Sequence, residues 1–132
     1  MRRNNPGNIH TPLGGYSHSL LVPADHDLLF VSGQVGIDPQ GAVLSGIAPQ
    51  SLQAFANLQA CLSDADLHVD QIVQLTIYLT DANFIKDARL ARQVVFGDVP
   101  DPACTLLVVS ALARPELLIE VEALAARKPK RL

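Results

Sequence analysis

The sequence contains no tryptophan, one methionine and two cysteines among its 132 residues. Cys61 and Cys104 are too few for a disulfide framework, and their separation does not match a metal-binding spacing. The four histidines include no i, i+4 pair, so we predict neither a metal site nor a cofactor. The glycines of "PLGGY" precede no predicted helix, which argues against a phosphate-binding loop. We therefore do not expect a metal-dependent or nucleotide-dependent enzyme.

Long apolar segments are also missing. No run approaches the roughly 18 residues that a membrane-spanning helix needs. The start, "MRRNNPGNIH", lacks the apolar segment of a secretory signal, so we expect a cytoplasmic protein with reduced thiols. The length suits one domain with its own core. We predict a single domain over residues 1–132, with an extended lead-in at 1–13 and a basic tail at 127–132.

Basic residues are scarce between the two ends of the chain. Residues 4–126 contain four basic and all thirteen acidic residues, which gives this stretch a net charge of −9. Lysine and arginine supply most of the affinity of proteins for nucleic acid by neutralising phosphates. We therefore expect no nucleic-acid partner, and we expect the basic ends to be solvated. These ends carry Arg2, Arg3, Arg127, Lys128, Lys130 and Arg131.

The apolar periodicity predicts two helices and five strands. A stripe of Leu52, Phe55, Leu58 and Leu62 indicates a helix over 47–66, and a second helix begins near Phe84 and ends at Gly97. Strands are expected at 16–22, 28–32, 70–81, 103–111 and 117–125. We expect 16–22 to pair with 28–32 across "PADHD". The order β-β-α-β-α-β-β predicts an α+β fold with two helices on one face of a mixed sheet.

The strand expected at 103–111 has apolar residues on both faces. Cys104, Leu106 and Val108 alternate with Thr105, Leu107 and Val109. Burial of apolar surface is worth roughly 25 cal/mol per Å², and two helices cover only one face of such a sheet. We therefore predict that other copies of the chain cover the second face in a homo-oligomer.

Several motifs occur in the order and spacing of one known family. "GGYSHSL", "LLFVSGQVGIDPQG", "LSDADL", "DQIVQLTIYLTD", "PACT" and "IEVEALA" together resemble the Rid family, also called YjgF or L-PSP, over about residues 14–126. The resemblance implies a homotrimer of chorismate-mutase-like α+β subunits with clefts for a small molecule between subunits. Active relatives hydrolyse reactive enamines and imines to a 2-oxo acid and ammonia, and others are named endoribonucleases or translation inhibitors.

The resemblance also implies roles for individual residues. Active members bind the substrate carboxylate with an arginine in "P-A-R", and Cys104 stands at that position in "P-A-C-T". A thiol cannot form the two parallel bonds of a guanidinium. A cleft-lining helix position that is commonly Asn corresponds to Ala88. The remaining expected ligand-binding residues are Tyr16, Ser32 and Gly33, with Cys104 beside them.

Glu120 matches the family glutamate that positions or activates water, and we predict it as the catalytic residue. It shares a strand face with Glu122, so the alternative is an acid pair on an edge strand facing solvent. Cys104 has three open interpretations: a nucleophile, a thiol that lines the cleft, or core packing. A nucleophile needs a thiolate, and His18 is the one histidine near a family motif.

Three functions remain as hypotheses. The first is a hydrolase of reactive enamines or imines whose specificity is altered by Cys104. The second is a trimer that binds a small ligand without catalysis or serves a regulatory role. The third is an endoribonuclease or translation inhibitor, which the acidic body and the lack of a histidine pair argue against.

Overall fold

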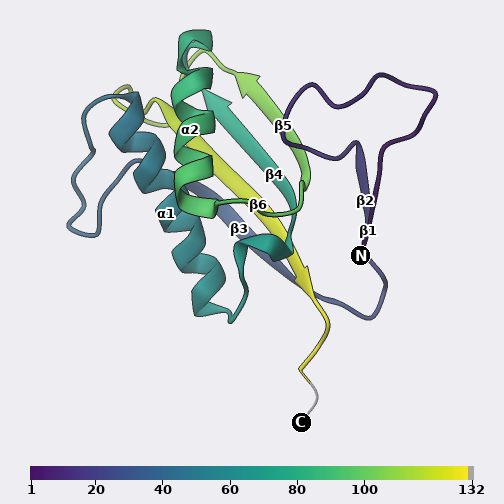
Figure 1. The fold of residues 1–132 in the computed structure, drawn as a ribbon. Coiled ribbons are helices and arrows are strands. Elements are labelled where there is room, and N and C mark those ends of the chain that lie inside the picture. Colours follow the sequence, from purple (N-terminus) through teal and green to yellow (C-terminus); the bar gives the residue numbers. More distant parts are fainter. Residues whose placement is uncertain (131–132) are drawn as a thin grey trace.

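A four-stranded sheet, two helices and an N-terminal arm make up the computed structural model, which describes residues 1–130 (Figure 1). The elements in chain order are β1 (Arg2–Asn4), β2 (Ser19–Leu21), β3 (Asp27–Val35), α1 (Ile47–Asp64), η1 (Val69–Gln71), β4 (Ile72–Leu79), η2 (Ala82–Phe84), α2 (Ile85–Phe96), β5 (Ala103–Val108) and β6 (Ile119–Arg127).

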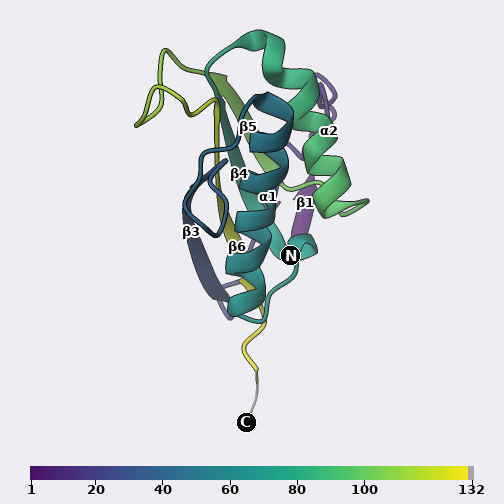
Figure 2. The same ribbon diagram turned by 90° about the vertical axis from the view of Figure 1, so that its left-hand side faces the viewer.

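The sheet order is β3-β6-β4-β5. The first three strands in this order are antiparallel neighbours, whereas β4 and β5 run parallel and are joined through α2. Parallel neighbours need such a crossover connection. Both helices lie on the same side of the sheet (Figures 1 and 2). The predicted α+β class, with two helices on one face of a mixed sheet, is confirmed.

The expected pairing of 16–22 with 28–32 is wrong. Within the first 21 residues, β2 pairs with β1, so part of the predicted lead-in forms a strand. The strand β3 pairs instead with β6 over most of its nine residues. This long ladder satisfies far more backbone groups than a short hairpin across 22–26 would. The arm of β1 and β2 extends beside β5 (Figure 1).

The core lies between the helices and one face of the sheet. Phe55 and Phe96 meet edge to face, with their ring centroids 5.3 Å apart, at the contact of α1 with α2. The predicted alternation of β4 is confirmed, because Leu75, Ile77 and Leu79 are buried beneath the helices. One member of the predicted α1 stripe, Leu52, remains exposed.

The opposite face of the sheet is open, because neither helix of residues 1–130 covers it (Figure 2). Phe30 of β3 is 77% exposed and Leu107 of β5 is 46% exposed. Leu107 is aligned with Tyr78, whose hydroxyl bonds Glu122 on this face. An uncovered face with exposed apolar side chains is thus present, as the sequence predicted, and polar side chains such as Gln74 and Thr76 also lie on it. Among the described residues, no helix is long and apolar enough to cross a membrane.

A buried glutamine ties the first turn of α1 to two loops. The Gln50 amide nitrogen donates to the carbonyls of Leu44 and Glu116, each at 2.9 Å. Its amide oxygen accepts from the Leu118 N–H at 2.9 Å. A Cβ on Gly36 would lie 2.6 Å from the Gln50 Cα, so only glycine permits this approach. Gln50 therefore fixes the loop before α1 against the loop that leads into β6.

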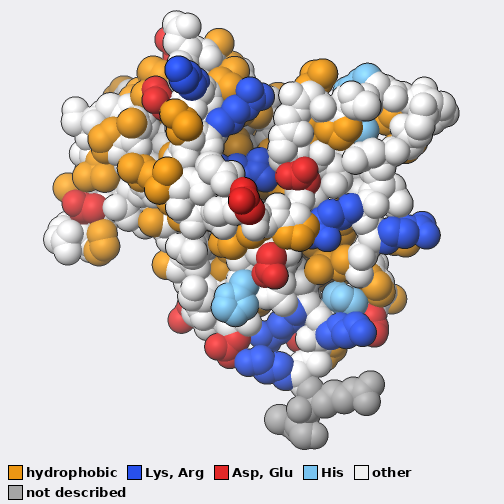
Figure 3. Space-filling view, viewed as in Figure 1, with side chains coloured by type: hydrophobic (Ala, Val, Ile, Leu, Met, Phe, Trp, Pro, Cys, Tyr) orange, Lys and Arg blue, Asp and Glu red, His pale blue; other side chains and the backbone are white. Residues whose placement is uncertain are grey.

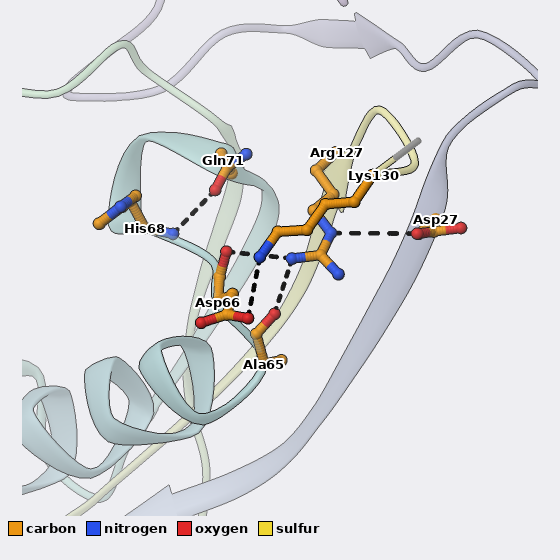
Figure 4. Close-up of polar contacts among 7 residues, drawn as sticks. All are labelled: Asp27, Ala65, Asp66, His68, Gln71, Arg127 and Lys130. Carbon is orange, nitrogen blue, oxygen red and sulfur yellow. Dashed lines mark hydrogen bonds and ion pairs between the residues drawn. The ribbon is translucent and has the colours of Figure 1, made fainter. Parts of the chain in front are cut away.

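The end of β6 contacts the end of α1 (Figure 4). Arg127 donates through one nitrogen to the carbonyls of Ala65 and Asp66, at 2.9 and 3.1 Å. Lys130 pairs with the Asp66 carboxylate at 2.9 Å, which holds the pKa of Asp66 below its usual value. The expected solvated tail is therefore wrong for Arg127, because free carbonyls at a helix end attract cations. Lys130 remains exposed, as expected. Residues 131–132 of that tail lie outside the described residues.

We expect Gln50→Leu to lower the free energy of unfolding by about 2–4 kcal/mol, because it leaves buried backbone groups without partners. Urea denaturation at fixed protein concentration measures this change. The control is Gln59→Leu on the same helix, whose side chain makes no hydrogen bond to residues 1–130. It should change stability by less than about 0.5 kcal/mol. Equal stability of both variants would contradict the role of Gln50.

Candidate functional site

The N-terminal arm is attached to the start of β5 at one buried serine. The Ser17 hydroxyl donates to the Asp101 carbonyl at 2.8 Å, and its N–H donates to the Pro102 carbonyl at 2.9 Å. Arg3 of β1 also donates to the Asp101 carbonyl at 3.1 Å. These bonds place Tyr16 beside Cys104, two of the residues that the sequence predicted in one site.

A cavity of about 370 Å³ lies between the arm, α2 and β5. Its lining includes Tyr16, Cys104, Gly14, Gly15, Arg89 and Arg92. This volume suits a small metabolite. Cys104 is aligned with the buried Leu75, so its side chain lies on the helical side of the sheet and packs against the core. Two of the three interpretations of Cys104 therefore hold together: its side chain lines the cavity and also packs against the core.

The third interpretation, a nucleophilic thiolate, finds no support. Burial raises the pKa of Cys104, and the charges of Arg92 and Arg89 offset this rise only in part. His18 is not directed at the thiol, because its Nε2 lies 2.7 Å from the His10 carbonyl and its ring packs edge to face on Tyr16. Cys104 is therefore a neutral thiol at neutral pH.

Helix α2 contributes two arginines to the cavity that the sequence analysis missed. Ala88, expected to line the cleft, is fully buried in the core instead. Arg89 and Arg92 lie on the side of α2 that borders the cavity. Basic side chains follow the edge of the helical lobe that faces the arm (Figure 3). A signal was present, because three of the four basic residues within 4–126 recur at steps of three, at Lys86, Arg89 and Arg92.

Ser32, Gly33 and Glu120 gather elsewhere, on β3 and β6. A bulge after Val31 sets Ser32 and Gly33 against one residue of β6. A Cβ on Gly33 would lie 2.7 Å from the Glu120 Cδ, so the carboxylate packs directly over this glycine. Bulges of this kind redirect side chains beside functional sites. The bulge therefore makes the space that the Glu120 carboxylate occupies.

Glu120 and Glu122 do share a strand face, but the edge-strand interpretation is wrong. The strand β6 lies inside the sheet, between β3 and β4. Glu122 accepts a 2.6 Å hydrogen bond from the Tyr78 hydroxyl. This bond raises the pKa of Tyr78 above its usual value, because ionisation would place two negative charges together. Glu122 is thus engaged, whereas Glu120 makes no side-chain hydrogen bond within residues 1–130.

The predicted site residues therefore form two groups on opposite faces of the sheet. Cys104 follows the buried Leu75 on the helical side, whereas Glu120 is aligned with Tyr78 on the open side. The cavity around Cys104 includes no residue of the Glu120 group. Because β5 is an edge strand, a neighbouring chain can approach it from the side. Among residues 1–130, no cluster of three histidine, cysteine or acidic side chains is placed to hold a metal ion.

Comparison with known proteins gives a consistent result. The family model described as Endoribonuclease L-PSP matches residues 8–127. The chain is 33% identical over 119 residues to a RutC family protein of Pyrococcus abyssi, covering 89% of this chain and 90% of that protein. It is 32% identical over 120 residues to a rat protein named 2-iminobutanoate/2-iminopropanoate deaminase, covering 89% and 83%. A crystal structure of a Rid family protein from Yersinia pestis superposes with a TM-score of 0.83 at 29% identity, covering 96% and 98%.

The thiol of Cys104 should react slowly with iodoacetamide at pH 7, because less than about 1% of it is thiolate there. In a Cys61→Ala background, the alkylation rate should rise with pH and inflect above 9.0, the ordinary value for the group. Mass spectrometry of the modified peptide measures this rate. An inflection below pH 8 would instead reveal an activated nucleophile.

Proposed function

The chain belongs to the endoribonuclease L-PSP family, the Rid family of the motifs above, and we propose that it hydrolyses small reactive imines and their enamine tautomers. The family match and the rat deaminase support this reaction class. The second part of the proposal is that the site is completed only between subunits of a homotrimer. It is supported by the positions of Cys104 and Tyr16 on one side of the sheet and of Glu120 on the other.

In the proposed reaction, Glu120 takes a proton from water as the water oxygen adds to the imine carbon. Glu120 passes this proton to the imine nitrogen, which gives a tetrahedral intermediate with a hydroxyl and an amino group on one carbon. Glu120 then takes the hydroxyl proton and delivers it to the amino nitrogen as the carbon–nitrogen bond breaks. The hydroxyl becomes the carbonyl of a 2-oxo acid, and ammonia leaves. No electron transfer or cofactor is required. A positioned base of this kind typically accelerates a reaction by about 10²–10⁴-fold.

The side chains around Glu120 suit this step. Glu122 is already occupied by the Tyr78 hydroxyl, which leaves Glu120 as the free carboxylate of the pair within residues 1–130. Gly33 gives the carboxylate room and presents backbone rather than a side chain. Tyr16 and the neutral thiol of Cys104 would form the opposite wall, contributed by the neighbouring subunit.

Glu120→Gln should lower the rate of ammonia release from freshly generated 2-aminoacrylate at least about 100-fold, because the amide cannot accept the proton of water. A coupled ammonia assay measures the rate against the buffer reaction. The matched control is Glu122→Gln, which makes the same change of charge two residues away and should retain most of the activity.

One outcome would contradict the hydrolase, and another would contradict the role of Glu120. The first is wild-type protein that releases ammonia no faster than buffer at stoichiometric concentration. If such protein still binds a small ligand, the alternative of a non-catalytic binding trimer is favoured. The second is an equal loss in both glutamate variants, which would point to a general disturbance of the open face. In that case Glu120 has no special role.

We expect Phe30→Asp to convert the trimer to monomers, because a charge replaces an apolar side chain on the face that subunits would cover. Size-exclusion chromatography with light scattering measures the mass at micromolar concentration. Val94→Asp is the matched control, since Val94 is also exposed but lies on α2, on the other side of the sheet. A monomeric wild-type protein, or dissociation by Val94→Asp alone, would contradict the assembly.

A further inference from the structure

We propose that Arg89 and Arg92 bind the carboxylate of the substrate, so that a pair of guanidinium groups on α2 replaces the arginine absent from β5. The proposal rests on the proposed function for the identity of the substrate. It names an anionic 2-imino acid, or its enamine tautomer, rather than a neutral imine.

The geometry of α2 brings both guanidinium groups to the cavity. Residues three apart share one side of a helix, and both side chains border the same space as Tyr16 and Cys104. The arm passes close by. A Cβ on Gly14 would lie 3.7 Å from Nη2 of Arg89. One on Gly15 would lie 3.7 Å from Nη1 of Arg92 and 3.6 Å from Oδ1 of Asp101. The two glycines leave the space between arm and helix open to a ligand.

The two arginines also have unused hydrogen-bonding capacity. Neither forms an ion pair or a side-chain hydrogen bond with residues 1–130. The acidic residues Asp98 and Asp101 line an adjoining cavity that both arginines also border, but neither aspartate forms an ion pair with them. Asp98 accepts a 2.8 Å hydrogen bond from Gln93 instead. Each guanidinium carries five donors in a fork that matches a carboxylate.

The charges of both arginines reach the Cys104 thiol in the cavity. They lower the pKa of this thiol, against the larger effect of burial, and Arg92 has the larger influence of the two. Arg92 is half-buried whereas Arg89 is exposed. Arg92 is therefore the principal carboxylate ligand in this proposal, and Arg89 adds a second positive charge at the entrance. Elsewhere the body of the chain is acidic, so these arginines are among its few internal cations.

The test is calorimetric binding of 2-oxobutanoate, a stable 2-oxo acid that cannot release ammonia. The wild-type protein should bind it. Arg92→Gln should weaken binding about tenfold or more, as expected for loss of a charge-assisted hydrogen bond. The double variant Arg89→Gln/Arg92→Gln should abolish measurable binding. Lys86→Gln is the matched control, because it removes the same charge from the same helix at a residue that does not line the cavity.

Two further ligands show whether binding requires the carboxylate and whether any anion suffices. 2-Butanone, which lacks the carboxylate, should not bind detectably. Inorganic phosphate should bind much more weakly than 2-oxobutanoate, and equal binding would show a general anion site and overturn the proposal. The proposal also fails if the wild type does not bind 2-oxobutanoate, or if folded arginine variants bind it as the wild type does.

The binding and ammonia assays distinguish this proposal from the hydrolase itself. Retained ammonia release with unchanged binding in both arginine variants would overturn the arginine assignment and leave the hydrolase standing. Arginine-dependent binding without ammonia release would overturn the hydrolase and leave a carboxylate-binding trimer. Circular dichroism of each variant verifies that the fold is retained.

Discussion

The helices of this protein cover one face of its sheet and leave the other open. Everything at the site follows from this constraint. Phe30 and Leu107 remain exposed on the open face, and the bulge with Glu120 lies on it, while the cavity around Cys104 lies on the helical side at the sheet edge. Because the two groups of residues are separated by the thickness of the sheet, a ligand that contacts both groups would need a second chain beside the first.

Much of the fold could be predicted from local pattern, because burial imposes the period of each element on its sequence. The alternation of 70–81 and the stripe of 47–66 gave the correct elements. The partner of β3 could not be predicted, because alternation shows which face is apolar and not which strand lies alongside. The contacts of Arg127 were missed for a similar reason, since a basic terminal run looks the same whether solvated or bound to a helix end.

Strand parity predicts which face a candidate site residue shares, but not what surrounds it. The parity of β6 correctly placed Glu120 and Glu122 on one face, although their environment depended on Tyr78, which is distant in sequence. On α2, each residue turns the side chain by about 100°. The sequence analysis expected Ala88 to line the cleft, but Ala88 lies in the core and the next residue, Arg89, lines the cavity. A helix alignment that is wrong by one residue changes the chemistry of the site completely.

The arginines stand on the surface of a helix rather than within a strand of the sheet. Substitutions at such surface positions usually alter stability by less than about 0.5 kcal/mol. A change at residue 89 or 92 can thus reverse the charge presented to an incoming molecule while the architecture stays intact. If the two arginines bind the substrate as proposed, selectivity can therefore be altered without a large loss of stability.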